Sequence, residues 1–256
     1  MHALTRHVPA SFAHALSATP PDPPIDVALA RAQHAAYRAA LAACGAAVTA
    51  IDADEACPDC VFVEDTAVVA GGIALVTRPG APSRRGETPP VARALARHVD
   101  LAWMDAPATL DGGDCLRVGR TIYAGRSART NAAGIARLAE VFADHTVVAV
   151  DLPPHVLHLK CVCSPLGDGR ILLAEGTLAP ELFAPHAIVW VPAAEAYAAN
   201  AVALGRHVVV ADGHPRTREA LEAAGFTTHA VAHSEVRKAD GSLTCQSILV
   251  TDVTGT

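Results

Sequence analysis

The sequence predicts one α/β domain built from repeated modules, and three observations point to that fold class. Hydrophobic residues make up 51% of the 256 residues and charged residues 18%, so the chain has enough apolar material for a large core. Short apolar strand patterns alternate with Ala-rich helical patterns. At three places a strand and a turn lead through an arginine into an Ala-rich helix, at Arg84, Arg129 and Arg216. Because no linker interrupts this repetition, we expect residues 1–256 to form a single domain.

Hydrophobic periodicity places the individual elements. Helices are predicted at residues 26–44, 83–97, 131–142, 194–204 and 216–224. Strands are predicted at 46–51, 61–69, 73–77, 116–118, 121–124, 146–150, 156–163, 170–174, 187–191, 207–211, 227–231 and 243–250. Residues 5–16 are polar and mobile in character, and the prolines between 19 and 24 exclude both helix and ladder there.

The last predicted strand contains a cysteine that could face a cavity. Asp240-Gly241 predicts a tight turn, and the apolar run that follows is interrupted by a polar stretch holding Cys245. A thiol on a rigid element can be held in place for chemistry. A free cysteine is more often a small buried apolar residue, so Cys245 alone decides nothing.

Two neighbouring acids, Glu64 and Asp65, lie within a predicted apolar strand. A buried carboxylate costs several kcal/mol unless it is paired. Two interpretations stay open: structural pairing with an arginine, or a receptor for a cationic ligand, with Asp59 as a third acid.

Other candidate groups lie at turns and strand ends. Asp111 and Asp114 flank a pair of glycines, where they could cap the turn or approach a ligand. His158 stands between two leucines, as a satisfied core histidine or as a catalytic base. Arg84 and Arg129 lie at the starts of predicted helices. They could bind a carboxylate ligand there, or they could be solvated arginines on surface helices. A cysteine, a histidine and buried acids together are the groups that nucleophilic catalysis requires.

Seven short motifs, in register over nearly the whole chain, resemble the dimethylarginine dimethylaminohydrolase family. They are Phe-Val-Glu-Asp at 62–65, Ser-Arg-Arg-Gly-Glu at 83–87, Thr-Leu-Asp-Gly-Gly-Asp at 109–114, Ser-Ala-Arg-Thr-Asn at 127–131, His-Leu-Lys at 158–160, Tyr-Ala-Ala-Asn at 197–200 and Asp-Gly-Ser-Leu-Thr-Cys at 240–245. The resemblance implies the pentein fold, a five-bladed α/β propeller of ββαβ-type modules around a pseudo-fivefold axis, with the active site in the central channel.

The resemblance also implies an activity: hydrolysis of asymmetric dimethylarginine and monomethylarginine to citrulline and dimethylamine or methylamine, through a covalent cysteine thiouronium. The catalytic residues it implies are Cys245 as nucleophile, His158 as general acid/base and Asp111, which orients His158. The substrate-binding residues it implies are Asp65 at the guanidinium, with Glu64 and Asp59 also at the substrate, Arg84 and Arg129 at the α-carboxylate, Leu16 on a flexible lid, and the backbone near Ala239 at the α-amino group. No cofactor and no metal are implied.

Three alternatives remain beside this interpretation. The chain could be an arginine deiminase or an amidinotransferase of the same fold, although it lacks the helical insertion of the longer deiminases. It could be a non-catalytic binding protein. Cys57-x-x-Cys60 with Cys161-x-Cys163 could also hold structural zinc, although the second pair is one residue too close for the usual spacing.

Charge and composition limit the classes of molecule that the protein is expected to bind. A formal net charge of −6 gives no electrostatic case for nucleic acid or an anionic membrane. No apolar run approaches the ~20 residues of a membrane span. Seven cysteines without an export signal predict reduced thiols and a cytoplasmic protein. We expect a small methylated arginine as the partner, and the sequence leaves monomer and homodimer open.

Overall fold

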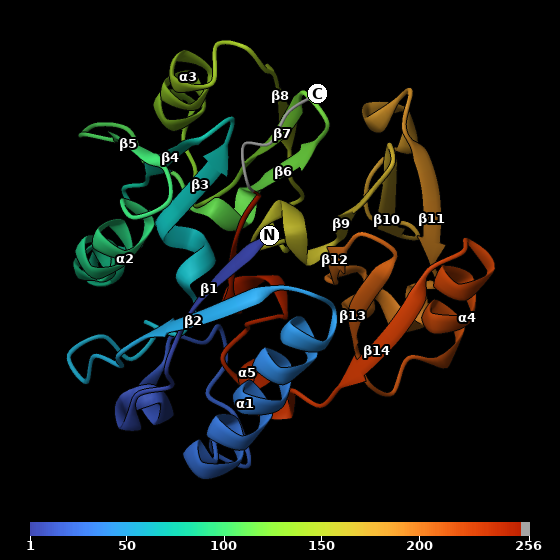
Figure 1. Cartoon of the computed structure of the whole chain (residues 1–256), viewed down its shortest axis with the longest axis horizontal. Coiled ribbons are helices and arrows are strands. Elements are labelled where there is room, and N and C mark those ends of the chain that lie inside the picture. The colour runs from blue at the N-terminus through green and yellow to red at the C-terminus, as the bar shows by residue number, and fades with distance from the viewer. Residues whose placement is uncertain (252–256) are drawn as a thin grey trace.

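The computed structural model describes residues 1–251, and within them the strands form five three-stranded sheets around a common centre (Figure 1). Four sheets follow one another along the chain: β3 (Ala67–Ala70), β4 (Ile73–Val76) and β5 (Asp100–Trp103); β6 (Cys115–Val118), β7 (Thr121–Arg126) and β8 (Thr146–Asp151); β9 (Cys163–Gly167), β10 (Arg170–Ala174) and β11 (Ala187–Val191); β12 (Val202–Leu204), β13 (His207–Ala211) and β14 (Thr227–Val231). The fifth sheet combines β15 (Ile248–Val250), β1 (His2–Arg6) and β2 (Ala47–Ile51).

Every sheet has the same internal order. Its first two strands run antiparallel, and its middle strand runs parallel to the third. A parallel pair needs a crossover connection, which is helical in each module. The crossovers are α2 (Thr88–Leu95), α3 (Ala132–Val141), the 3₁₀ turn Pro180–Phe183, α4 (Pro215–Ala223) and α1 (Val27–Ala43). Five ββαβ modules around one centre are the architecture that the sequence resemblance implied.

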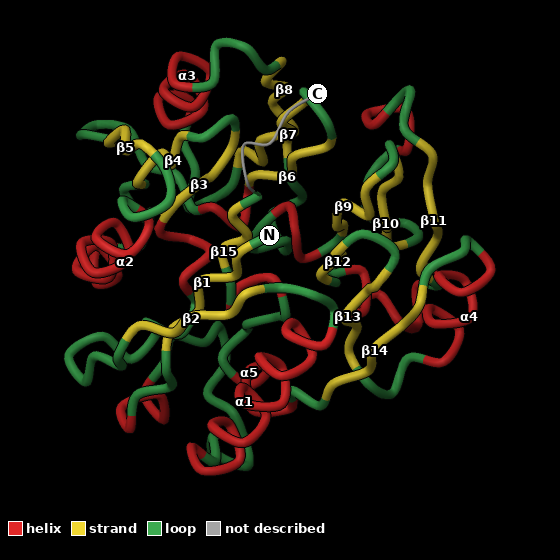
Figure 2. The backbone as a smooth tube through the Cα atoms, in the orientation of Figure 1, coloured by secondary structure: helices red, strands yellow, loops and turns green. Residues whose placement is uncertain are grey.

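The fifth module joins the two ends of the described chain. Its central strand, β1, pairs antiparallel with β15, with His2 opposite Val250 and Leu4 opposite Ile248. It also pairs in parallel with β2, and Figure 2 shows the three strands side by side near the centre. Residues 5–16 were predicted to be polar and mobile, but Thr5 and Arg6 belong to strand β1. The pairing that makes these residues a strand comes from the other end of the chain and leaves no local signal.

The apolar cores lie between neighbouring modules. Val68 and Leu75 of the first sheet pack in one cluster with Ile122 of the second sheet and with Leu138 and Phe142 at α3. A second cluster joins the second sheet to the third, and a third cluster packs α1 on β13 and β14. With apolar packing placed at these junctions, polar side chains can occupy the centre. Within residues 1–251, no helix combines the length and the apolar character that a membrane span requires.

The helix predicted at 26–44 is confirmed as α1, with both of its ends. The Asp26 side chain accepts a hydrogen bond from Leu29 N at 3.0 Å, as an N-cap does. Gly45 follows the Cys44 C-cap with a φ of +91°, the left-handed conformation that glycine adopts without steric cost.

Four predicted elements were wrong where the modules join. The strand predicted at 61–69 starts only at Ala67, and the one at 156–163 starts only at Cys163. The helix predicted at 194–204 is a 3₁₀ turn followed by β12, and the strand predicted at 243–250 begins only at Ile248. A buried turn has the same apolar composition as a buried strand, so periodicity cannot separate the two. The sequence analysis also missed β5, β12 and the short helix α5 (Ser234–Lys238).

Candidate active site

A short 3₁₀ turn precedes the first strand of every module, and we call these five segments the axial turns. They are Val63–Thr66, Gly112–Asp114, Leu159–Cys161, Ala193–Ala199 and Thr244–Gln246. The turn Val63–Thr66 contacts Thr244–Gln246 and Gly112–Asp114, and Leu159–Cys161 contacts Gly112–Asp114 and Ala193–Ala199, so the turns meet at the centre of the ring. Of the polar residues singled out from the sequence, Glu64, Asp65, Asp114 and Cys245 lie in these turns, and Asp111 and His158 directly precede two of them. Cys245 and His158 are thus held by these turns and not by strands as expected.

Two glycines allow the axial turns to approach closely. A Cβ on Gly112 would lie 2.0 Å from the Glu64 carbonyl oxygen. A Cβ on Gly113 would lie 2.8 Å from His158 Nδ1. Gly113 N also donates to Asp65 Oδ1 at 2.9 Å. The glycine pair is therefore needed for the approach of neighbouring modules, beyond forming a turn.

A cavity of about 920 Å³ opens beside these turns, and most of the predicted site residues line it. The predicted residues that line it are Leu16, Asp59, Asp65, Arg84, Arg129, His158, Ala239 and Cys245. Sequence analysis missed Tyr197 and Arg237, which also line it; Tyr197 lies in the Tyr-Ala-Ala-Asn motif, whereas Arg237 carried no motif. The Arg237 guanidinium carbon lies 4.5 Å from the centre of the Tyr197 ring, a cation–π contact.

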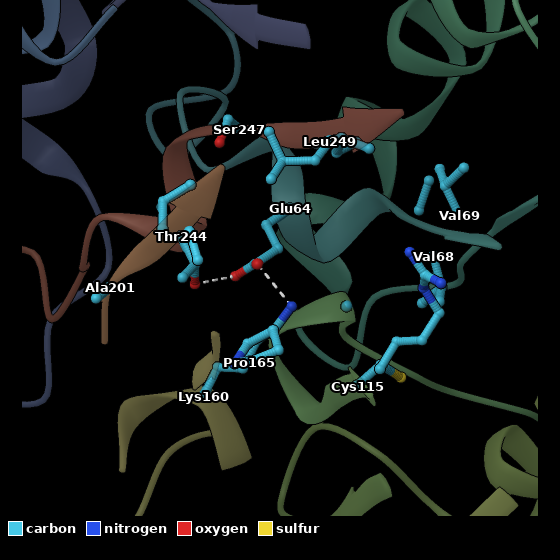
Figure 3. A pocket seen from close by; sticks show the side chains of 16 residues that line it. Glu64, Val68, Val69, Cys115, Lys160, Pro165, Ala201, Thr244, Ser247 and Leu249 are labelled. Carbon is cyan, nitrogen blue, oxygen red and sulfur yellow. Dashed lines mark hydrogen bonds and ion pairs between the residues drawn. The ribbon is translucent and has the colours of Figure 1, made fainter. Parts of the chain in front are cut away.

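Glu64 and Asp111 lie outside the lining of this cavity. Asp111 is fully buried behind His158. The Glu64 carboxylate accepts from Lys160 Nζ and from Thr244 Oγ1, both at 2.6 Å (Figure 3). These three residues line a smaller cavity of about 170 Å³, whereas Asp65, Cys161 and Cys245 line the larger one. Consecutive residues of three axial turns therefore face different cavities, and the Glu64–Lys160–Thr244 group lines the smaller one.

His158 is held and charged by carboxylates. Its Nε2 lies 3.1 Å from Asp111 Oδ2, and Gly80 N donates to the other oxygen of Asp111 at 2.8 Å. Burial lowers the pKa of His158, but the charge of Asp65 and the hydrogen bond to Asp111 outweigh it and raise the pKa to about 9. His158 is therefore an imidazolium near neutral pH, and both ring nitrogens can donate.

Arg84 is buried among acceptors. Its Nη1 lies 2.5 Å from Asp65 Oδ2 and its Nη2 lies 2.8 Å from Glu87 Oε2. Nη2 also donates to the Phe62 carbonyl oxygen at 2.9 Å. Burial raises the pKa of Asp65, but the positive charges of His158 and Arg84 outweigh it and hold the pKa at about 2. Of the two interpretations left open for the neighbouring acids, the ionic pairing is present for both: Asp65 with Arg84, and Glu64 with Lys160.

Arg129 is more available than Arg84. Its side chain keeps 22% of its surface exposed, and its Nη1 lies 3.8 Å from Asp111 Oδ2. It follows Ser127, whose Oγ accepts from Arg129 N at 3.0 Å and donates to Asp114 Oδ2 at 2.6 Å. Asp114 therefore fixes the loop that carries Arg129.

Cys245 is a half-buried thiol among negative charges. Burial raises its pKa well above the ordinary value, and the carboxylates of Glu64 and Asp65 raise it further. The next two residues are anchored on α1: Gln246 Oε1 lies 3.0 Å from His34 Nδ1, and Ser247 Oγ lies 2.7 Å from the Tyr37 hydroxyl oxygen. The thiol is thus held in place by its neighbours and is neutral near neutral pH.

The segment around Leu16 lies along the cavity and is tied to it by backbone bonds. Leu16 N donates to Asp59 Oδ1 at 3.0 Å, and Ala18 N donates to Asp240 Oδ2 at 2.6 Å. Both acceptors line the cavity, and 42% of Leu16 remains exposed. The predicted lid residue, Leu16, is therefore hydrogen-bonded to Asp59, which is itself a predicted site residue.

The zinc alternative from the sequence is not supported by the geometry. Among the described residues, two clusters bring three metal-type ligand atoms within 4.8 Å of one another: Asp65 with Asp111 and His158, and Cys44 with His207 and His229. Neither cluster contains Cys57, Cys60, Cys161 or Cys163.

Comparisons with known proteins decide the family. The model of the family described as N,N dimethylarginine dimethylhydrolase, eukaryotic, matches residues 22–181. The dimethylarginine dimethylaminohydrolase of Pseudomonas aeruginosa is 37% identical over 229 residues, covering 87% of this chain and 89% of the relative. The chain belongs to the dimethylarginine dimethylaminohydrolase family. Its relative from Streptomyces coelicolor with the same name is 41% identical over 228 residues, covering 88% of this chain and 87% of the relative.

Solved structures of this family show the same fold. A mutant of the Pseudomonas aeruginosa dimethylarginine dimethylaminohydrolase in complex with citrulline superposes with a TM-score of 0.91 at 36% identity, covering 96% of this chain and 98% of that chain. The N-terminal domain of a cyanobacterial arginine dihydrolase superposes with a TM-score of 0.89 at 20% identity, covering 98% of both chains, which shows the shared fold alone. The pentein propeller expected from the sequence is therefore confirmed.

Proposed function

We propose that this protein hydrolyses Nω-methylated arginines, asymmetric dimethylarginine and monomethylarginine, to citrulline with release of dimethylamine or methylamine. The observation that carries the proposal is one cavity lined by the Cys245 thiol, a protonated His158 and the Asp65 carboxylate. Membership of the dimethylarginine dimethylaminohydrolase family and the likeness to a relative that holds citrulline support it.

Charge would set the direction of the substrate. Its guanidinium suits the negative end of the cavity, where Asp59 and Asp65 lie, and Glu64 adds negative charge from behind. Its α-carboxylate suits the arginines, of which Arg129 has the more available guanidinium. The Ala239 carbonyl, beside the turn at Asp240, would meet the α-amino group. The lid segment at Leu16 would then cover the bound substrate.

Binding of the cationic substrate would favour ionisation of the Cys245 thiol. In the free protein burial, and then the carboxylates of Glu64 and Asp65, raise the pKa of Cys245, so the thiol is neutral. A guanidinium placed beside Asp65 offsets this negative charge and lowers the pKa of Cys245. The thiolate then forms where the guanidino carbon lies, which limits reaction with other electrophiles.

The reaction would proceed in two displacements. The Cys245 thiolate attacks the guanidino carbon, and His158, protonated near neutral pH, gives its proton to the leaving amine. The C–N bond breaks and a covalent S-alkylthiouronium remains on Cys245. The now neutral His158 takes a proton from water, which attacks the same carbon. The C–S bond of the tetrahedral adduct then breaks as its hydroxyl proton passes to solvent, which releases citrulline and restores the thiolate beside a protonated His158, while Asp111 keeps the imidazole oriented.

Product analysis tests the proposal directly. Citrulline and the released amine are measured with arginine, monomethylarginine and asymmetric dimethylarginine as separate substrates. We expect both methylated substrates to give citrulline and the matching amine, and Cys245→Ser to give none. His158→Gly should lose turnover but still accumulate an adduct on the peptide that holds Cys245, seen by mass spectrometry. Ammonia release from arginine as the preferred reaction, or an adduct on Cys161, would overturn the proposal.

A further inference from the structure

A second set of metal-type ligands lies away from the cavity, at the end of α1. Cys44 is the C-cap of α1, His207 lies on β13 and His229 lies on β14. Their ligand atoms all lie within 4.8 Å of one another. None of these residues belongs to a motif of the family resemblance, and they are far apart in the sequence.

The fold brings the two histidines to one face of the fourth sheet. β13 and β14 are parallel, with His207 opposite Thr227 and Val209 opposite His229. Because side chains alternate along a strand, residues 207 and 209 share a face with 229 and 231. That face packs against α1, since Val209 and Val231 share a core cluster with Leu41 and Cys44. The histidines therefore meet the thiol at the end of this apolar contact.

The separations suit a tetrahedral ion. His207 Nδ1 and His229 Nε2 lie 3.0 Å apart. Zinc bonds of about 2.0–2.1 Å to nitrogen and 2.3 Å to sulfur place tetrahedral ligand atoms roughly 3.3–3.6 Å from one another. The three atoms thus need shifts well within side-chain freedom to share one ion, and a water molecule can complete the fourth position.

The surroundings also favour a cation. Cys44 ends a helix of 17 residues, and the C-terminal end of a helix carries partial negative charge on its unpaired carbonyl oxygens. The nearby Arg206 directs its Nη1 to the Gly225 carbonyl oxygen. A thiolate and two neutral imidazoles form a ligand set that zinc prefers.

We propose that Cys44, His207 and His229 form a zinc site that clamps the C-terminal end of α1 to the fourth sheet. The ion links α1, the crossover helix of the fifth module, to strands of the fourth module. Binding breaks the His207–His229 hydrogen bond and releases the Cys44 proton, so one thiolate sulfur and two imidazole nitrogens donate to the ion. This site is separate from the cavity with Cys245.

The test uses the full-length Cys245→Ser protein, in which the thiol of the large cavity cannot bind metal. Zinc is titrated against a chromophoric chelator, and Co²⁺ is added separately as a spectroscopic probe. We expect one zinc ion per chain, a higher Tm with zinc, and a thiolate-to-cobalt charge-transfer band with tetrahedral d–d bands. Adding Cys44→Ala should abolish the charge-transfer band, and either Cys44→Ala or His229→Gln should weaken zinc binding at least about tenfold.

Cys57→Ala is the matched control, because Cys57 is a similarly buried cysteine outside both ligand clusters. It should leave zinc affinity and the cobalt spectrum unchanged. His229 is only half-buried, so His229→Gln keeps the test valid if Cys44→Ala does not fold. No bound zinc in the Cys245→Ser protein overturns the proposal. So does zinc binding that survives both ligand substitutions and is lost in Asp111→Asn, since that result assigns the ion to the other cluster.

Discussion

At the scale of the residue, the carboxylates around His158 couple its charge to the stability of the fold. Its pKa rises from 6.5 to about 9 in the folded protein, against the effect of burial, through Asp65 and Asp111. The folded state therefore holds this proton more tightly than the unfolded state. The difference contributes on the order of 3 kcal/mol at pH values below 6.5, and the contribution is lost as the pH rises through 9.

Replacing His158 should remove this part of the pH dependence. We expect the free energy of unfolding of the wild type, measured with urea, to fall between pH 6 and pH 9.5 by about 3 kcal/mol more than that of His158→Asn. Thiol ionisation in the unfolded state also lowers stability at high pH, but it acts on both proteins and cancels in the difference. Equal pH slopes for the two proteins would mean that folding leaves the pKa of His158 unchanged.

The two arginines of the cavity should respond differently to substitution. Arg129→Ala should lower kcat/KM about tenfold to a hundredfold, because a charge-assisted hydrogen bond contributes about 1.5–3 kcal/mol. Decarboxylated dimethylarginine should be a poor substrate of the wild type and should lose little more in this variant. Arg84→Ala should instead cost about 3–5 kcal/mol of stability, because it leaves the buried Asp65 and Glu87 without their shared cation.

A cycle of enzyme variant against substrate head group separates these roles. Arg129→Lys is the conservative control, since it keeps the charge and loses the planar fork. Equal losses with and without the carboxylate in Arg129→Ala would make Arg129 a structural residue. A stable Arg84→Ala protein whose defect depends on the carboxylate would show that Arg84 leaves Asp65 to bind substrate.

At the scale of the element, the axial turns mark the limit of the sequence-based prediction. Motifs located Glu64, Asp111 and His158 but placed Glu64 and His158 in strands, because a buried 3₁₀ turn and a strand share an apolar composition. The bounds of the long helix α1 were predicted correctly, since Asp26 and Gly45 act locally. Nothing local indicates which neighbour each polar side chain meets across modules. The sequence thus indicates Asp59 as a substrate-binding residue but not its hydrogen bond with Leu16 N.

The hydrogen bond between Leu16 N and Asp59 should affect substrate binding through the lid segment. Asp59→Ala removes the acceptor for Leu16 N and a negative charge from the cavity, so it should raise KM severalfold. Glu55→Ala is the matched control, because Glu55 accepts from Ala10 N and Ser11 N in the same segment but lies outside the cavity. It should leave KM unchanged. Steady-state kinetics with dimethylarginine decides, and an equal rise in both variants would assign the effect to general loosening of residues 10–18.

At the scale of the whole molecule, the ring closes by a pairing that the other modules make locally. In four modules the first two strands form a hairpin within one stretch of chain, as β9 and β10 do around the exposed turn at 167–169. In the fifth module the same antiparallel pair consists of β15 and β1, from opposite ends. Repeated modules could be predicted from the sequence, but their number could not. The fifth module forms only when β15 pairs with β1.

A circular permutant should therefore fold and remain active. A short Gly/Ser linker would join residue 256 to Met1, and the new ends would open at Asp168 in the exposed turn. The linker turns β15 and β1 into an ordinary hairpin, and closing this contact locally should speed folding, since local contacts form faster than distant ones. We expect a Tm close to that of the wild type and equal citrulline production. A permutant opened between Gly112 and Gly113 is the control, because it cuts a buried axial turn and should lose both fold and activity. If the permutant opened at Asp168 also fails to fold, the closure of the ring requires more than the pairing of β15 with β1.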